Sequence, residues 1–178
     1  GSGVNKQEVE WSGVDVLLGE VSLEDALQHP AEVGYDLLAA NGDLTAAEVE
    51  LMAVDDRLLQ LRKILDTVAD KYKYILIDCP PTLNILTLNA FVAADGVIVP
   101  LQCEYYALEG LTALMDTMER VQESYNPELE LQGIVRTMYD SRNRLSVEVS
   151  QQLISHFGDK VYDSVIPRNV TLAEAPSY

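Results

Sequence analysis

The sequence predicts an α/β fold with a mostly parallel sheet and helices on both faces. Short β-prone runs alternate with stripes of helical spacing along the chain, which is the pattern of βαβ units. The 178 residues are 48% hydrophobic, enough to bury a sizeable core. Neither repeats nor linkers interrupt the pattern, so we expect residues 1–178 to form a single domain.

The first third of the chain predicts short elements. Residues 1–3 resemble the remnant of an expression tag and are given no structural meaning. Ser22 is the expected N-cap of a short helix, with Asp25 at the capping-box position. Residues 35–40 are expected to form a short strand, and leucine and valine recur at helical spacing over residues 55–71.

A β-prone apolar run at residues 74–77 leads into Asp78 and then two prolines. Because it is apolar throughout, the run predicts a strand buried on both faces. The strand should end at Asp78, since the two prolines cannot extend a central strand. A carboxylate at the carboxyl end of such a strand lies where α/β sheets bind ligands, and phosphate-binding folds commonly use it for magnesium. An Asp that caps the next turn is the structural alternative.

The second half of the chain predicts a regular alternation of helices and strands. In chain order we expect a helix at 83–94, a strand at 96–101, a helix at 108–121, a strand at 131–138, a helix at 145–157 and a strand at 161–166. Right-handed crossovers place all the strand carboxyl ends on one edge. Polar residues follow the strands there, which indicates a ligand site.

Charge and cysteine content limit the classes of partner. The net charge of −17 argues against a general polyanion binder. Residues 1–56 carry −12 of it, whereas five basic and four acidic residues lie between Arg136 and Arg168, where a local DNA-facing patch is compatible with the sequence. Cys79 and Cys103 belong to no metal-binding pattern, so we expect buried free thiols in a cytoplasmic protein that does not enter a membrane.

Five short motifs follow one another along the chain. They are Asp78-Cys-Pro-Pro-Thr-Leu83, Thr87-Leu-Asn-Ala90, Gln102-Cys-Glu-Tyr-Tyr-Ala-Leu-Glu-Gly-Leu111, Thr137-Met-Tyr-Asp-Ser-Arg142 and Ile166-Pro-Arg-Asn-Val-Thr-Leu-Ala-Glu-Ala-Pro-Ser177. In this order and at these spacings they resemble the ParA/Soj family of deviant-Walker ATPases, which segregate plasmids and chromosomes. The resemblance covers nearly the whole chain and implies a P-loop NTPase-like fold.

The resemblance also implies roles for individual residues. Asp78 matches the catalytic Walker B carboxylate, which positions magnesium through water. The adenine-contacting and neighbouring positions match Met138, Pro167, Arg168 and Asn169. The nucleotide-sensing segment that approaches a partner subunit matches Gln102, Glu104, Tyr105 and Glu109, and the DNA-facing surface matches Arg142 and Arg144. The structural alternatives at the adenine positions are a core methionine, a strand-ending proline and a surface ion pair.

The phosphate-binding part of the family pattern has no match in this sequence. The family carries Lys-Gly-Gly-x-Gly-Lys-Thr after its first strand, then a strand ending in the Asp that orients water, and neither occurs here. We therefore expect a sheet without the amino-terminal P-loop strand, and no ATP hydrolysis by this chain. Open strand edges should make the chain dimerise, aggregate or be marginally stable.

A second departure concerns DNA. Thr171 occupies a position where the family commonly carries a DNA-contacting arginine. Losing one phosphate contact lowers the salt slope of binding by about one unit. With a net charge of −17, this predicts weak or no DNA binding by this chain.

For the full-length parent, the resemblance implies a nucleotide switch that is associated with the nucleoid. MgATP closes a homodimer, the dimer binds DNA nonspecifically, and a ParB-like partner stimulates hydrolysis. One alternative is a relative without a P-loop that acts as a binding or dimerisation module. Another is a different deviant-Walker relative, such as a MinD-like division-site regulator or a cofactor-biosynthesis ATPase. A MinD-like protein needs a carboxyl-terminal amphipathic membrane helix, and the segment from Glu104 to Gly110 favours ParA/Soj.

Overall fold

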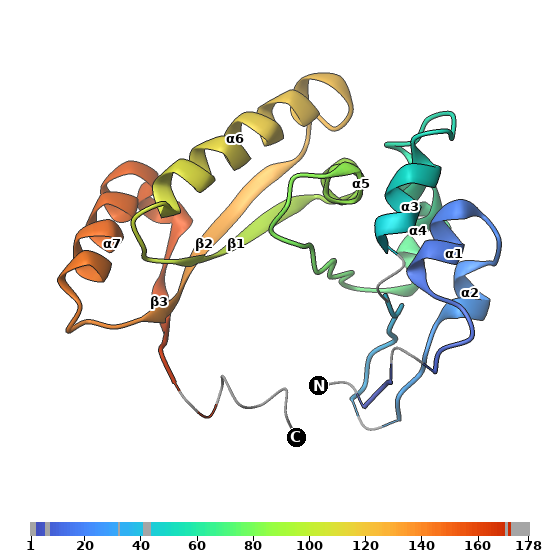
Figure 1. Ribbon diagram of the computed structural model, residues 1–178, viewed down its shortest axis with the longest axis horizontal. Helices are drawn as coiled ribbons and strands as arrows, with labels where there is room; N and C mark the ends of the chain where they lie inside the picture. Colours follow the sequence, from blue (N-terminus) through green and yellow to red (C-terminus); the bar gives the residue numbers. More distant parts are fainter. Residues whose placement is uncertain (1–2, 6–7, 32, 41–43, 170, 172–178) are drawn as a thin grey trace. The chain divides into compact units, whose positions relative to one another are not determined.

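The computed structural model describes residues 3–5, 8–31, 33–40, 44–169 and 171. The chain divides into two compact units, Gly1–Ala93 and Ala94–Tyr178, coloured blue to green and green to red in Figure 1. Each unit has a buried apolar cluster of its own. A single domain stays a prediction, because this division reflects contacts within the chain and not independent folding.

The first unit is helical in the part that the structure describes. Its elements are α1 (Gly13–Leu18), α2 (Leu23–Ala26), α3 (Leu44–Leu51), α4 (Gln60–Asp66), the 3-10 helix η1 (Ala69–Lys71) and α5 (Ile85–Ala93). The predicted cap of α2 is confirmed, since Ser22 Oγ accepts a hydrogen bond from Asp25 N at 3.2 Å. The core of this unit contains Val16, Leu23, Ala26 and Val68.

Three sequence predictions for the first unit are wrong, wholly or in part. Residues 35–40 contribute only an isolated antiparallel bridge between Leu37 and Gln28. The helix expected over 55–71 is reduced to α4 and η1, because Asp56 has a φ of 54° and cannot belong to a right-handed helix. Residues 74–77 form no strand ladder with any described residue and are exposed, Leu76 at 91%.

A buried amide ties α5 to α4 and accounts structurally for one of the five motifs. Asn89 is 1% exposed, and its Nδ2 donates to Arg57 O at 2.8 Å and to Ile85 O at 2.9 Å. Its Oδ1 accepts from Leu61 N at 3.2 Å. Every polar atom of this side chain is therefore used within the first unit, as a buried amide requires.

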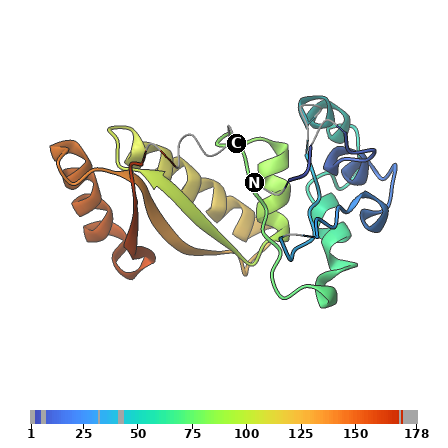
Figure 2. The same ribbon diagram turned by 90° about the horizontal axis from the view of Figure 1, so that it is seen from below.

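The second unit is a parallel sheet covered by two helices. Its elements are β1 (Gly96–Gln102), α6 (Ala107–Ser124), β2 (Glu130–Tyr139), α7 (Arg144–Phe157), the 3-10 helix η2 (Gly158–Lys160) and β3 (Val161–Pro167). The strands run in the order β1-β2-β3 and are parallel in both pairs. Right-handed crossovers put α6 and α7 on the same face, and seen from below in Figure 2 the strands lie in front of α6. The predicted α/β class is confirmed, and the elements begin and end within a few residues of their predicted bounds.

The core of the second unit lies between the sheet and its helices. It contains Leu101, Cys103, Leu111, Ile134, Val149, Leu153 and Val161. Cys103 is a buried free thiol, as predicted, and burial raises its pKa. Gly158 ends α7 with a φ of 54°, a conformation that glycine adopts without strain. Among the described residues, no helix combines the length and apolarity needed to cross a membrane.

A buried arginine connects β2 to helix α7 and to strand β3. Arg136 is 8% exposed, and its Nη1 donates to Ser150 Oγ of α7 at 2.9 Å. Its Nη2 donates to the carbonyl oxygens of Tyr162 and Asp163 on β3, at 2.9 and 3.0 Å. Because β3 pairs with β2 in a broken register, these bonds reinforce an otherwise irregular ladder.

We expect Arg136→Met to destabilise the chain by about 3 kcal/mol, because it removes charge-assisted bonds to buried Ser150 Oγ and to two partly buried carbonyl oxygens of β3. Arg120 is exposed on α6, and Arg120→Met should change the free energy of unfolding by less than about 0.5 kcal/mol. Urea unfolding of both variants checks this. Equal stability of the two would show that the Arg136 bonds do not contribute.

Candidate functional site

The carboxyl ends of the three strands meet at one edge of the sheet. The register places Gln102 of β1 opposite Thr137 of β2, and Tyr139 of β2 opposite Pro167 of β3. Arg168 N donates to Tyr139 O at 3.1 Å, which holds the chain beside β2 after β3 has ended. The structure thus brings the predicted edge residues of all three strands together in the second unit.

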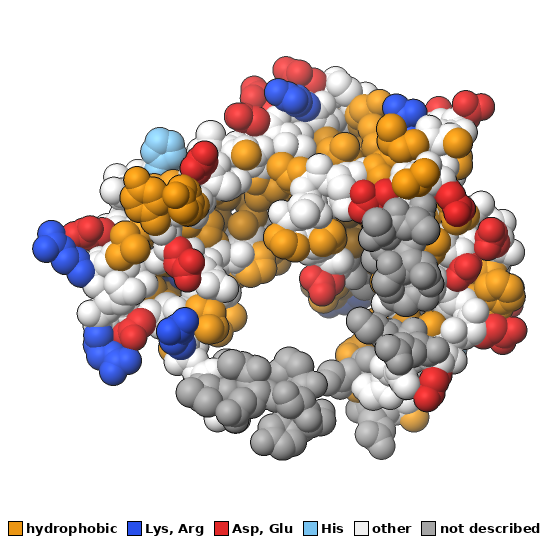
Figure 3. Space-filling view, in the orientation of Figure 1, with side chains coloured by type: hydrophobic (Ala, Val, Ile, Leu, Met, Phe, Trp, Pro, Cys, Tyr) orange, Lys and Arg blue, Asp and Glu red, His pale blue; other side chains and the backbone are white. Residues whose placement is uncertain are grey.

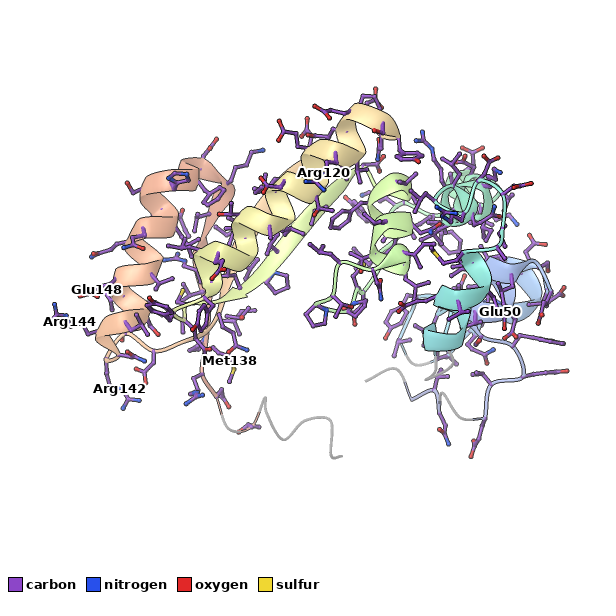
Figure 4. All side chains as sticks on the ribbon, turned by 45° about the horizontal axis from the view of Figure 1, so that its top comes forward. Glu50, Arg120, Met138, Arg142, Arg144 and Glu148 are labelled. Atoms are coloured by element: carbon purple, nitrogen blue, oxygen red, sulfur yellow. The ribbon has the colours of Figure 1, made fainter. Side chains whose placement is uncertain are left out.

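Met138 has an unusual backbone conformation at this edge. Its φ is 50°, in the left-handed region that side chains other than glycine rarely adopt. Such a conformation costs on the order of 1–3 kcal/mol and is concentrated at functional sites. Its side chain is half-buried at the end of β2, beside the turn that leads into α7 (Figure 4). The sequence identified this residue by resemblance and gave no sign of its backbone conformation.

The turn between β1 and α6 presents exposed side chains next to Gln102. Glu104 N donates to Gln102 O at 2.9 Å, and Ala107 N donates to Glu104 O at 3.0 Å, so the turn is held by its own backbone. Tyr105 and Tyr106 are 73% and 72% exposed, and their rings meet edge to face with centroids 5.0 Å apart. The sequence assigns Tyr106 no role, although it lies beside Tyr105 in the same motif. An exposed aromatic pair with a nearby carboxylate is typical of a protein-contacting surface.

Glu109 is exposed in the first turn of α6 and continues this surface. At the end of β3, Pro167, Arg168 and Asn169 are exposed as well. Thr171 is exposed, and the remainder of the last motif lies outside the described residues.

Asp78 lies in the first unit, directly after the extended segment 74–77. Its side chain is exposed. Burial, reinforced by the charge of Asp78, raises the pKa of the half-buried Cys79 thiol, so this thiol stays protonated at neutral pH and is a poor metal ligand. Within the described ranges, no three His, Cys, Asp or Glu side chains form a metal-binding group. A lone exposed carboxylate fits a magnesium ion that keeps most of its water and binds phosphates.

Of the two predicted DNA-facing arginines, Arg142 lies on the turn from β2 into α7 and Arg144 is the first residue of α7. Each is paired with a carboxylate. Asp140 Oδ1 accepts from the backbone N and the Nε of Arg142, and its Oδ2 accepts from Arg142 Nη2, all at 3.0 Å. Arg144 Nε lies 2.7 Å from Glu148 Oε1. Figure 3 shows basic and acidic side chains side by side where α7 begins, and Figure 4 labels Arg142, Arg144 and Glu148 there.

These ion pairs alter the electrostatics of the turn. The hydrogen bonds from Arg142 lower the pKa of Asp140 to about 2, and the charge of Arg168 acts in the same direction. Asp140 therefore stays ionised at every physiological pH. The family resemblance identifies both arginines but neither partner, although the i, i+4 spacing of Arg144 and Glu148 is a signal in the sequence for one of the two pairs.

Comparison with known proteins places these features in a family. Residues 1–131 match a family model described as AAA domain. The chain is 51% identical over 180 residues to chromosome partitioning protein ParA of Caulobacter vibrioides, covering 100% of this chain and 67% of that protein. It is 50% identical over 164 residues to chromosome-partitioning ATPase Soj of Treponema pallidum, covering 92% of this chain and 65% of that protein.

The structure is similar to that of cobyrinic acid a,c-diamide synthase from Mycobacterium smegmatis with bound ADP and magnesium. The TM-score is 0.85 at 38% identity, over 94% of this chain and 68% of that chain. The ordered motifs agree with the match to ParA, which extends over the whole of this chain and 67% of that protein. The chain belongs to the ParA/Soj family of chromosome-partitioning ATPases.

Proposed function

We propose that this chain carries three surfaces of a nucleotide-dependent partition switch. They are a base-binding edge at Met138 and Pro167, a dimer-facing surface around Tyr105, and a DNA-facing surface around Arg142. The meeting of Gln102, Met138 and Pro167 at one sheet edge is the observation that supports this most. A purine needs apolar atoms against its ring faces and hydrogen-bonding groups at its rim. Met138 and Pro167 offer the first, and Arg168 and the amide of Asn169 offer the second.

The nucleotide in this proposal is ATP or ADP with magnesium. The related synthase was solved with ADP and magnesium, which supports the same ligand class here. Asp78 would hold the ion through water, consistent with its exposure and with its place after an extended apolar segment. Bound magnesium supplies neutralisation of phosphate charge.

The surface formed by Glu104 and Tyr105 on the β1–α6 turn and by Glu109 in the first turn of α6 faces a second copy of the chain in this proposal. Its tyrosines are exposed and its backbone is fixed, so a partner would meet a surface with little rotamer freedom to lose. In the parent protein, the dimer so formed binds DNA nonspecifically on the nucleoid, and a ParB-like partner stimulates hydrolysis.

A second candidate function is a binding or dimerisation module that works without ATP turnover. The exposed edge-to-face pair of Tyr105 and Tyr106 favours it, because this surface is presented without a nucleotide. In that case the Tyr105 turn carries the function and the base-binding edge is dispensable.

Met138 tests the base-binding edge. We expect Met138→Gly to raise stability by about 1 kcal/mol, because glycine adopts a φ of 50° without strain. The same change should weaken adenine-nucleotide binding about fivefold or more, since it removes the apolar contact to the base. Met138→Leu keeps the contact and the strain, and should bind as the unsubstituted chain does.

Urea unfolding measures the first effect, and equilibrium dialysis with labelled ADP measures the second. Undiminished ADP binding by Met138→Gly would show that Met138 is a core residue without contact to nucleotide. The second candidate function would then be preferred.

A further inference from the structure

The turn from β2 into α7 holds its two exposed arginines in ion pairs within the chain. The side chains of Arg142 and Arg144 are 89% and 92% exposed, so both can reach an external ligand. The N–H groups that face Asp140 and Glu148 are nevertheless occupied. The two positive charges that would attract phosphate are therefore each balanced by a neighbouring carboxylate.

The Arg142 pair has the geometry that a phosphate would use. Nε and Nη2 donate to the two oxygens of one carboxylate, the parallel fork in which arginine also binds phosphate oxygens. One guanidinium edge cannot serve both acceptors at once. Carboxylate and phosphate must therefore compete for the same two N–H groups.

We propose that Asp140 is an internal competitor that restrains Arg142 from binding DNA phosphate. The proposal rests on the proposed DNA-facing role of Arg142 and adds the residue that sets its strength. In the free chain Asp140 occupies the guanidinium, and DNA binding requires the pair to open. Arg168 lies close enough to influence Asp140, so the carboxylate keeps a cation beside it when Arg142 turns to phosphate.

Glu148 is a weaker competitor for Arg144. This pair makes one hydrogen bond between residues four apart on an exposed helix, whereas Asp140 makes two to the Arg142 side chain and a third to its backbone. Exposed i, i+4 pairs contribute little, so their loss frees little binding capacity. Asp140 is consequently the carboxylate that most restrains phosphate binding at this turn.

The test is binding of this chain to a fluorescein-labelled DNA duplex of arbitrary sequence, followed by anisotropy over a series of salt concentrations. Asp140→Asn removes the charge but keeps the side-chain oxygen that accepts from Arg142 N, so the turn should persist. It should raise the association constant about two- to fivefold at low salt. The slope of log K against log salt should steepen by up to about 0.9.

Three further variants identify the cause of any gain. Arg142→Gln should weaken binding, and Asp140→Asn combined with Arg142→Gln should bind no better than Arg142→Gln alone. Asp159→Asn removes the same charge from η2 and should change the association constant by less than about 1.5-fold. Glu148→Gln should give a gain of less than about twofold.

The other outcomes would contradict either the competition between Asp140 and phosphate or the DNA role of Arg142. Equal gains in Asp140→Asn and Asp159→Asn would mean that net charge alone acts. Unchanged affinity in Asp140→Asn, with a loss in Arg142→Gln, would refute the competition and leave the DNA role of Arg142 intact. Binding that is unaffected by Arg142→Gln would refute the DNA role of Arg142 and the competition with it. No binding by any variant, Asp140→Asn included, would refute the competition, because freeing Arg142 would then restore nothing.

Discussion

ATP hydrolysis in the presence of this chain should not exceed the rate in buffer. Phosphoryl transfer depends almost entirely on positioning and on electrostatic stabilisation of the phosphate oxygens. No stretch of the 178 residues offers the glycine-rich backbone and lysine that provide these. A single cationic group in such a site accelerates phosphoryl transfer about 10³- to 10⁵-fold. Without the phosphate-binding lysine and backbone, the turnover rate should therefore be at least about 10³-fold below that of an intact family member.

A phosphate-release assay with magnesium checks this prediction. Asp78→Ala is the matched variant, since a trace contaminant ATPase would be indifferent to it. Turnover that requires magnesium and disappears in Asp78→Ala would contradict the prediction, because it would mean that a phosphate cradle is formed by residues not recognised in the sequence.

The chain should self-associate through residues 74–77. This apolar segment is exposed and belongs to none of the described helices or strands, and within the described residues it has no strand partner. Unpaired N–H and C=O groups beside apolar side chains are a template for pairing with another chain. Leu76→Lys puts a charge at a position that is 91% exposed, so it should raise the concentration at which association begins about tenfold.

Light scattering coupled to size-exclusion chromatography measures this association. Val49→Lys is the control, because Val49 is also apolar and 73% exposed but belongs to helix α3, whose backbone groups are already hydrogen-bonded within the helix. It should leave the onset unchanged. A monodisperse monomer at about 100 µM, unaffected by Leu76→Lys, would show that the segment is inert.

The same segment shows where sequence reasoning fails. The run from Tyr74 to Ile77 has the composition of a buried strand, and pattern rules assign it as one. Burial and pairing, however, depend on neighbours that a local pattern does not contain. Asp56 illustrates a second limit, since its positive φ interrupts a continuous helical stripe without any glycine to announce it.

The second unit was predictable for physical reasons. β1 and β2 are β-prone runs that are each followed by a long amphipathic helix, Gly158 marks the end of α7, and a single topological rule brings the strand ends to one edge. Side-chain pairing within the turn was not predictable in the same way. The bond between Asp140 and Arg142 depends on the turn conformation, and the strain at Met138 depends on how β2 ends.

The most direct test of the account is an amide NMR titration of this chain with adenosine and, separately, with MgATP. The account assigns the base to the edge formed by β1, β2 and β3, and assigns no phosphate cradle to the chain. It predicts shifts at Met138, Arg168 and Asn169 with both ligands, at dissociation constants within about threefold of each other. Binding of MgATP about 100-fold tighter than adenosine, or no shift at these three residues, would contradict it.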